Sequence, residues 1–226
     1  NMVGHAGPFV LSSSTRRGML MFRLLVINPG STSTKISVFD GQDCIFTESV
    51  FHDAPVLLQF RTANDQLPFR AQVIREILEK HNIDITSIDV WVGRGGCAYS
   101  QGEGVMEIDD LLVRDTADDK GGSDHPAKLG VMLANEFCKQ YGGKMFTVNP
   151  TNVDELCDYA RITGIAGLYK RAQTHVLNQK AVAAAHAKSL GKRYEDCNFV
   201  VCHIDGGITI SAHQKGRIID CNDGGG

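Results

Sequence analysis

The feature of this sequence that most constrains its fold is a pattern of three strands that occurs twice, once near each end. In both copies an apolar, β-favouring run ends in a glycine-containing polar loop, a second run follows, and a short turn leads into a third. The first copy predicts strands at 24–27, 36–39 and 44–50, and the second predicts them at 199–202, 208–213 and 217–221. Asn28 and His203 hold the same place in the two loops. A unit repeated at a domain-length interval predicts two related lobes that face a cleft.

Helical periodicity fills the region between the two copies. Apolar residues recur every three to four positions at 71–81, 126–141, 152–162 and 175–190. Ser123 and Asp124 are positioned to cap the second of these helices. Apolar runs at 87–92 and 145–148 predict buried strands. Strands that alternate with helices around two hairpins predict an α/β fold.

The chain is expected to have three parts. Residues 1–20 are expected to be a disordered leader, because small, polar and turn-forming residues dominate them. Residues 21–148 would form the first lobe, and residues 149–226 would begin a second lobe. The chain ends in three glycines, and because a glycine loop should lead to another element, we expect a fragment with an incomplete second lobe.

Charge and cysteine content exclude several classes of function. The 226 residues carry 23 Lys and Arg against 26 Asp and Glu, so no basic surface for nucleic acid is expected. No apolar run reaches the roughly 18–20 residues of a membrane-spanning helix. The seven cysteines include no C-x-x-C pair, which argues against a zinc or dithiol site and indicates buried thiols in a reducing cytosol. We therefore expect a cytoplasmic protein without nucleic acid or membrane partners.

The loop at 28–35 has the composition of a phosphate-binding loop. It offers backbone N–H groups, four hydroxyls and the Lys35 amine within eight residues, and a hairpin loop of this kind can cradle a phosphate. An ordinary hairpin loop would look the same. The second loop, at 203–207, favours the phosphate interpretation, because two loops at equivalent places can hold two ends of one polyphosphate. The first loop is not a Walker A loop, because the glycine spacing before Lys35 differs and no helix follows.

Three further side chains could serve an anion site. Arg94 lies between glycines, so a ligand could approach the backbone while the guanidinium binds a carboxylate or phosphate. His125 begins an expected helix, where anions are favoured, and His175 precedes another. Each has an ordinary alternative, which is a solvated arginine in a turn or a capping histidine. No spacing of His, Cys or Asp is typical of a transition-metal site.

Six stretches of the chain together resemble the butyrate kinases, in the acetate kinase group of the actin, hexokinase and heat-shock ATPase superfamily. The stretch at 27–35 is similar to the phosphate loop that opens that family, and the others follow in the same order at 92–96, 125–130, 153–162, 175–182 and 203–220. The similarity covers about residues 21–223. It implies a ribonuclease H-like duplicated two-lobe fold, with the first lobe complete and the second partial. It also implies ATP and Mg²⁺ as cofactors, and transfer of the γ-phosphate to a short-chain fatty acid such as butanoate, giving an acyl phosphate and ADP.

The resemblance also implies roles for individual residues. The catalytic residues would be Asn28, Arg94, His125, Asn149 and His175. Among these, Arg94 would bind the substrate carboxylate and His175 would stabilise the phosphoryl group in flight. The cofactor-binding residues would be Gly30, Ser31, Thr32, Ser33, Lys35, His203, Gly206 and Gly207. Mg²⁺ would be held through phosphates, near Asn28 and Asn149. Such a reaction needs no strong base, because a carboxylate is already ionised at neutral pH, so the protein has to align and neutralise two anions.

Two departures from the family pattern keep other functions open. Asn149 stands where the family has an aspartate, and Asp205 stands where it has a glycine. The first change loses a charge, and the second would repel and crowd ATP phosphates. The alternatives are a degenerate, non-catalytic relative, or another phosphotransferase of the superfamily such as a sugar kinase or a polyphosphate phosphatase. A sugar kinase needs an aspartate base, and no candidate stands at the lobe boundary. The resemblance further implies ATP and a short-chain acid as partners, and a homo-oligomer.

Overall fold

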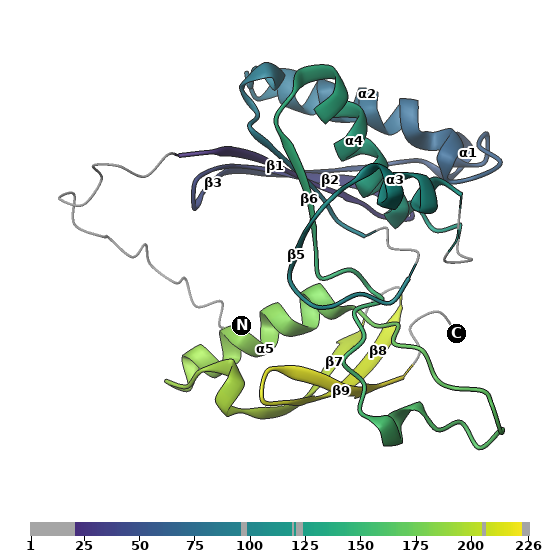
Figure 1. Cartoon of the computed structure of the whole chain (residues 1–226). Helices are drawn as coiled ribbons and strands as arrows, with labels where there is room; N and C mark the ends of the chain where they lie inside the picture. Colours follow the sequence, from purple (N-terminus) through teal and green to yellow (C-terminus); the bar gives the residue numbers. More distant parts are fainter. Residues whose placement is uncertain (1–20, 96–98, 119, 121–123, 205–206, 223–226) are drawn as a thin grey trace.

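A sheet of six strands and a sheet of three strands organise the protein into an upper and a lower part (Figure 1). The structure is a computed structural model that describes residues 21–95, 99–118, 120, 124–204 and 207–222. The expected leader at 1–20, the family departure at Asp205, and the predicted cofactor residue Gly206 lie outside the described residues.

The six-stranded sheet brings three parallel carboxyl ends to one edge. Its strands are β1 (Arg23–Pro29), β2 (Ser33–Asp40), β3 (Asp43–Phe51), β4 (Val90–Gly93), β5 (Val105–Glu107) and β6 (Lys144–Val148). The strand order is β3-β2-β1-β4-β6-β5. Strand β4 runs parallel to both β1 and β6, whereas β2, β3 and β5 pair in antiparallel fashion. The carboxyl ends of β1, β4 and β6 therefore lie side by side, and the β6 end leads toward the lower part (Figure 1).

Two amphipathic helices cover one face of this sheet (Figure 1). They are α2 (Leu67–Lys80) and α4 (Leu129–Tyr141), and the shorter helices α1 (Ala54–Leu57) and α3 (Asp110–Ala117) lie beside them. The apolar stripes predicted from the periodicity pack against the sheet and form one core with it. The buried residues of this core include Leu25, Ile27, Ile36, Val73, Ile74, Ile77, Leu78, Trp91, Leu129, Leu133 and Phe137. Burial of apolar side chains at this scale is the main force that holds the upper part together.

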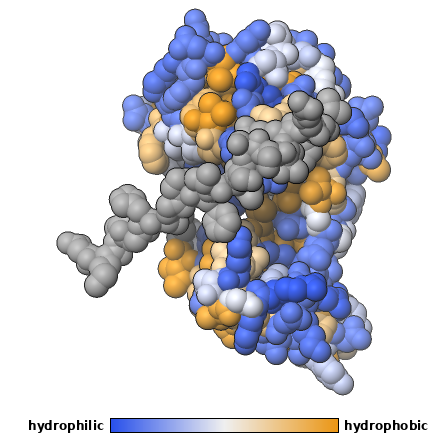
Figure 2. Space-filling model, turned by 90° about the vertical axis from the view of Figure 1, so that its left-hand side faces the viewer, coloured by the Kyte–Doolittle hydropathy of each residue, from blue (hydrophilic) through white to orange (hydrophobic). Residues whose placement is uncertain are grey.

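The lower part is a three-stranded antiparallel sheet with one long helix packed on it. The strands are β7 (Asn198–Ile204), β8 (Ile208–Gln214) and β9 (Arg217–Cys221), and the helix is α5 (Val176–Ser189). Lys180 on α5 forms ion pairs with Glu103, in the loop before β5, and with Glu155. The pair with Glu103 joins the lower part to the upper one, whereas Glu155 belongs to the lower part, where it also accepts from the Ile218 N–H of β9. Seen from the side in Figure 2, the surface is indented between the two parts.

Most of the elements predicted from the sequence are confirmed, with shifted ends. All six hairpin strands form, as do the helices at 71–81 and 175–190 and the strand at 145–148. The strand expected at 87–92 begins only at Val90, because a 3₁₀ helix, η2 (Ile85–Ser87), precedes it. Four other 3₁₀ helices are η1 (Asn64–Gln66), η3 (Pro126–Lys128), η4 (Asp158–Arg161) and η5 (Tyr194–Asp196).

The helix expected at 152–162 is wrong. Only the short η4 forms there, because the backbone of this segment finds partners outside a helix. The Asp154 carboxylate accepts from the Leu156 N–H at 3.2 Å and forms an ion pair with Arg161. The Cys157 N–H donates to the carbonyl of Ile219 in β9. Side chains of this type compete with the helical hydrogen-bond pattern.

The prediction that Ser123 and Asp124 cap the helix expected at 126–141 is wrong for Asp124. Ser123 lies outside the described residues. Asp124 instead accepts from the Ala63 N–H. The residue that caps the segment is His125, whose ring accepts from the Ala127 N–H. Within the described ranges, no helix is long and apolar enough to cross a membrane.

Candidate functional site

Asn28 and Arg94 meet at the carboxyl edge of the six-stranded sheet. Asn28 lies near the end of β1 and Arg94 directly follows β4, and the register places Ile27 opposite Gly93. The Arg94 N–H donates to the carbonyl of Ile27 at 2.8 Å and extends the parallel ladder. The Arg94 side chain then donates from Nη1 to Asn28 Oδ1 at 3.0 Å. The strand register thus joins two of the predicted catalytic residues.

Three glycines bring the start of α4 against this edge. A Cβ on Gly93 would lie 2.2 Å from the carbonyl oxygen of Gly130, and a Cβ on Gly130 would lie 2.2 Å from the carbonyl oxygen of Arg94. Gly95 adopts a φ of +89°, and a Cβ on it would lie 2.6 Å from the carbonyl oxygen of Ala127. Only glycine permits two backbones to approach this far. The glycines around Arg94 therefore have a packing role, which differs from the ligand approach suggested by the sequence.

His125 is held in one tautomer beside the phosphate loop. The Ala127 N–H, which can only donate, lies 3.1 Å from His125 Nδ1, so Nδ1 accepts and the neutral ring carries its proton on Nε2. That Nε2 lies 3.3 Å from Ser31 Oγ and donates to it. Loss of hydration lowers the pKa of His125 below its usual value, and Arg94 and Arg70 lower it further. Much of the residue stays exposed, so the lost hydration comes from protein atoms that crowd the ring rather than from full enclosure.

The loop from 28 to 35 closes on itself and leaves its tip open to solvent. The Gly30 N–H donates to the carbonyl of Ser33 at 2.8 Å, and the carbonyl of Thr32 accepts from the His52 N–H at 2.8 Å. The side chains of Ser31, Thr32 and Lys35 are exposed, and Lys35 lies opposite Asn28 in the register of β1 and β2. Hydroxyl and ammonium donors are therefore presented beside Arg94 and His125.

A buried arginine lies beneath this loop. Arg70 on α2 is fully buried, and its Nη1 donates to the carbonyl of Ser33 at 2.6 Å and to Thr34 Oγ1 at 3.1 Å. Its Nε and Nη2 donate to Gln66 Oε1 at 3.0 and 2.9 Å. Burial lowers the pKa of Arg70 to about 10, so the guanidinium remains charged at neutral pH. Because each of these partners is uncharged, the positive charge of Arg70 adds to that of Arg94 and favours anions at the loop.

His175 and His203 form a second cluster in the lower part. Their rings stack with centroids 3.8 Å apart and an interplanar angle of 11°. His175 directly precedes α5, with no capping hydrogen bond from its side chain, and His203 lies near the end of β7. His175 Nδ1 lies 2.9 Å from Thr209 Oγ1, and His203 Nδ1 lies 2.8 Å from Asn178 Nδ2. The two loops that the sequence paired thus each hold part of a polar cluster, and Gly207 directly precedes β8, the return strand of the second one.

Asn149 follows β6 at the same carboxyl edge, and its side chain has a structural partner. Its φ is +41°, a conformation that asparagine and aspartate tolerate better than most residues. Asn149 Oδ1 accepts from the Gly104 N–H at 2.7 Å, and the Asn149 N–H donates to the carbonyl of Gly104 at 3.0 Å. Asn149 also lines a hollow of about 340 Å³ together with Glu103 and Lys180. The residue therefore anchors the loop before β5 at the boundary between the two parts.

Sequence reasoning missed the buried polar residues that support these clusters. They are Thr34 and Arg70 under the first loop, and Gln179 and Thr209 beside His175. The sequence did contain one indication for Gln179. It is a polar residue on the apolar side of a helix that begins next to a candidate histidine, and a buried polar side chain needs a hydrogen-bond partner. The described residues contain no group of three or more His, Cys, Asp or Glu that could hold a metal ion.

Two curated proteins are similar to nearly all of this chain. A probable butyrate kinase of Enterococcus faecalis is 44% identical over 204 residues, which are 90% of this chain and 56% of that protein. Butyrate kinase 1 of Clostridium acetobutylicum is 40% identical over 203 residues, which are 90% of this chain and 57% of that protein. The resemblance to the butyrate kinases is confirmed. The chain spans somewhat more than half the length of these relatives, and no family model matches it.

Solved structures show that the fold is that of the acetate kinases. An acetate kinase from Entamoeba histolytica superimposes with a TM-score of 0.63 over 90% of this chain and 55% of that one, at 16% identity. A propionate kinase from Francisella tularensis superimposes with a TM-score of 0.60 over 90% of this chain and 58% of that one, at 17% identity. The predicted α/β two-lobe fold, present in part, is therefore confirmed.

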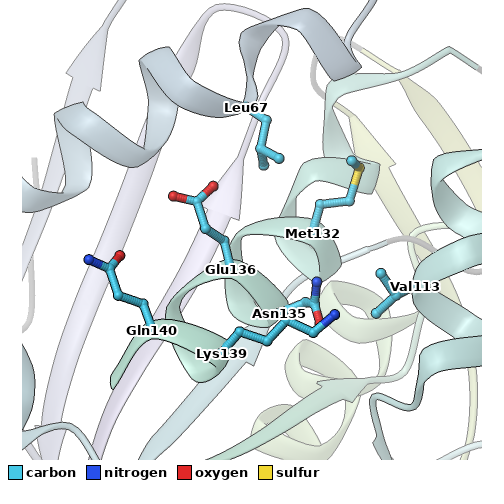
Figure 3. A pocket seen from close by; sticks show the side chains of 7 residues that line it. All are labelled: Leu67, Val113, Met132, Asn135, Glu136, Lys139 and Gln140. Carbon is cyan, nitrogen blue, oxygen red and sulfur yellow. The ribbon is translucent and has the colours of Figure 1, made fainter. Parts of the chain in front are cut away.

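A larger hollow lies outside the six stretches that carry the butyrate kinase resemblance. It measures about 470 Å³ and opens on the outer surface between α2, α3 and α4 (Figure 3). Its lining residues are Leu67, Val113, Met132, Asn135, Glu136, Lys139 and Gln140. None of these belongs to the predicted site, so residues of this hollow supply control variants for tests of that site.

Proposed function

We propose that this chain carries the carboxylate-binding and phosphate-binding part of a butyrate kinase-type enzyme. The reaction would transfer the γ-phosphate of ATP to the carboxylate of a short-chain fatty acid such as butanoate, giving an acyl phosphate and ADP. The observation that carries the proposal is the hydrogen bond between Arg94 and Asn28 beside the hydroxyls of the phosphate loop. This hydrogen bond holds a guanidinium next to hydroxyl and ammonium groups that can bind phosphate. Such an arrangement can align the substrate carboxylate with the ATP phosphate.

The described residues fit the phosphates of ATP. The loop presents the hydroxyls of Ser31 and Ser33 and the Lys35 amine, and Arg70 adds positive charge from below. Mg²⁺ is usually bound through one or two protein ligands together with substrate phosphates. Asn28 and Asn149 each offer a carbonyl oxygen with two lone pairs, of which one already accepts a hydrogen bond. Bound Mg²⁺ would neutralise phosphate charge during the transfer.

Each residue of the site would act by position and charge. Arg94 would bind the acid and hold it in line with the phosphoryl group, since a guanidinium forms paired hydrogen bonds to a carboxylate. His125 is neutral and donates through Nε2, so it could orient an oxygen without adding charge. His175 and His203 would donate to the phosphoryl oxygens from the opposite side. No residue needs to remove a proton, because the attacking carboxylate is already ionised.

Acyl phosphate formation tests the proposal directly. We would incubate the chain with ATP, Mg²⁺, butanoate and hydroxylamine, which traps the product as a hydroxamate. A chimaera in which the remaining part of the Enterococcus faecalis relative follows the chain would be assayed beside it. We expect hydroxamate from the chimaera, its loss in the Arg94→Ala variant, and its retention in Gln140→Ala, which alters only the outer hollow. Folded proteins that yield no hydroxamate in either form would overturn the proposal.

Localisation and assembly follow as parts of the same proposal. Because the reaction consumes ATP, we place it in the cytoplasm. A homo-oligomer is a further prediction, which size-exclusion chromatography with light scattering would check. The non-catalytic alternative rests on Asn149 and on Asp205, and Asp205 lies outside the described residues. The side chain of Asn149 already has a structural role at Gly104, and that role suits an active enzyme equally well.

A further inference from the structure

Three side chains form a buried hydrogen-bonded row that ends on the His175 ring. Gln179 lies on α5, one turn after His175, and is 1% exposed, while Thr209 on β8 is completely buried. Gln179 Nε2 lies 3.1 Å from the carbonyl oxygen of Thr209 and 3.0 Å from Thr209 Oγ1. Thr209 Oγ1 in turn lies 2.9 Å from His175 Nδ1.

The direction of each hydrogen bond in this row follows from the chemistry of its members. A backbone carbonyl can only accept, so the atom of Gln179 that faces it must be the amide nitrogen. That nitrogen carries two hydrogens and donates the second one to Thr209 Oγ1. In the described part of the structure, the other amide atom, Gln179 Oε1, is buried without a partner. A flipped amide would set this oxygen against the Thr209 carbonyl oxygen.

The Thr209 hydroxyl passes this direction on to the histidine. Oγ1 has two lone pairs and could accept from both neighbours, but its own hydrogen would then be buried with no acceptor among the described residues. We therefore assign that hydrogen to the bond with His175 Nδ1. Nδ1 therefore accepts, and the proton of the neutral ring is on Nε2. The tautomer of a histidine is set by the hydrogen bond that its other nitrogen makes.

We propose that Gln179 is a positioning residue which, acting through Thr209, fixes His175 as the neutral tautomer with its proton on Nε2. A ring in this state donates to an anion through Nε2 without first having to gain a proton. The stack with His203 at 3.8 Å supports a neutral ring, since two imidazolium ions at that distance would repel each other. The use of this donor toward a transferred phosphoryl group rests on the proposed function, whereas the tautomer itself does not.

Nuclear magnetic resonance of the intact chain with ¹⁵N-labelled histidine tests the tautomer. The two ring nitrogens of a neutral histidine have different ¹⁵N shifts according to which one carries the proton. The His175 signals would be assigned by their loss in His175→Gln. We expect the proton on Nε2 in the unaltered chain and in the control Thr209→Ser, which keeps the hydroxyl. A proton on Nδ1 in the unaltered chain would overturn the inference.

The Gln179→Glu variant should reverse the row. Facing the Thr209 carbonyl, the buried carboxyl group must be protonated: it donates its hydrogen to that carbonyl, and the same oxygen accepts from the Thr209 hydroxyl. Oγ1 then becomes free to accept from His175, and the ring proton should move to Nδ1. If this variant does not fold, Thr209→Val serves instead, because it removes the link at nearly constant size and should give a mixture of tautomers. A folded variant of either kind that keeps the proton wholly on Nε2 would refute the role of Gln179.

Kinetics of the active chimaera separate the two proposals. With the donor misplaced, Gln179→Glu should lower kcat about 100-fold, as for loss of one preorganised donor, and leave KM for butanoate unchanged. A structural defect would instead alter both constants together. A shifted tautomer in a protein that forms no acyl phosphate would support this inference while the proposed function fails. If the chimaera is active but the unaltered chain carries the His175 proton on Nδ1, the proposed function is supported and the tautomer inference fails.

Discussion

Arg94 donates from Nη1 to Oδ1 of Asn28 over 3.0 Å, across the carboxyl ends of two neighbouring parallel strands. An amide oxygen holds the guanidinium in place without neutralising it, and within the described residues no carboxylate is paired with Arg94. Burial lowers the pKa of Arg94, but an arginine remains charged at neutral pH. The pair is therefore organised to receive an anion.

Replacement of Arg94 should weaken butanoate binding more than it weakens the fold. Arg94→Ala removes both the charge and the paired donors, and hydrogen bonds to charged groups are worth about 1.5–3 kcal/mol. We expect the Kd for butanoate, measured by calorimetry, to rise at least about tenfold. The Kd of Arg94→Lys should lie between those of the unaltered chain and Arg94→Ala, because lysine keeps the charge but lacks the paired donors of a guanidinium. An affinity for butanoate unchanged in Arg94→Ala would refute this assignment.

The pKa of His125 should report the charge on Arg94. Desolvation of the ring lowers this pKa, and the positive charges of Arg94 and Arg70 lower it further. Removal of the first charge in Arg94→Gln should therefore raise the pKa, which a titration of the His125 ring signals by nuclear magnetic resonance would measure. Arg75→Gln is the matched control, because Arg75 pairs with Glu136 on the outer side of the helices. Equal His125 pKa values in the two variants would contradict the proximity of Arg94.

Local sequence patterns were sufficient to predict every strand except β5, whereas the grouping of Asn28 with Arg94 was implied by the family resemblance. Alternating apolar residues determined which faces are buried, and the family motif placed both polar residues after strands. The wrong helix at 152–162 has a simple cause. Its periodicity is real, but Asp154 pairs with Arg161 in a non-helical arrangement, and the Cys157 N–H donates to the carbonyl of Ile219. The second contact exists only after the second hairpin has formed.

The supporting residues could not be predicted, because their role depends on contacts distant in sequence. Arg70 looks like a solvated residue on an amphipathic helix, yet it is buried under Ser33 and Thr34. For Gln179 the sequence could indicate that a partner is needed, but only the packing of β8 identifies that partner as Thr209. The sequence suggested that the glycines beside Arg94 let a ligand approach the backbone. The backbone that approaches Gly93 is instead that of Gly130, on α4.

Gly93→Ala should disrupt the site and the fold together. Its new Cβ would lie 2.2 Å from the carbonyl oxygen of Gly130, so the end of β4 and the start of α4 must separate. Overpacking of this kind costs about 1–3 kcal/mol, which urea denaturation would measure. Gly102→Ala is the control, since a Cβ there meets nothing within 4 Å and its φ is ordinary. Equal stability of the two variants would show that the backbone contact is looser than described.

Asn149→Asp should keep the boundary loop intact. Aspartate tolerates the φ of +41° nearly as well as asparagine, and its carboxylate can accept from the Gly104 N–H in the same way. The melting temperature of Asn149→Asp should therefore be close to that of the unaltered chain. Hydroxamate formation by the chimaera should rise, because the variant adds a negative charge. Asn149→Ala loses the 2.7 Å hydrogen bond and should be destabilised by about 1–3 kcal/mol. A melting temperature for Asn149→Asp as low as that for Asn149→Ala would contradict this role.

The buried His213 should make the fold sensitive to acid. His213 is 2% exposed, its Nδ1 lies 2.6 Å from the Tyr194 hydroxyl, and burial together with the charge of Lys180 lowers its pKa from 6.5 to about 4. Between these two pH values the unfolded chain binds a proton that the folded chain does not, so stability falls as the pH decreases through this window.

The size of this effect can be isolated with one variant. His213→Asn keeps an acceptor for Tyr194 and removes the titrating group. The loss of unfolding free energy between about pH 7 and about pH 5 should be larger in the unaltered chain than in His213→Asn by about 2 kcal/mol. Urea denaturation at the two pH values measures both losses. If they are equal, His213 gains its proton in the folded protein as readily as in the unfolded one, and the ring cannot be enclosed beside Lys180.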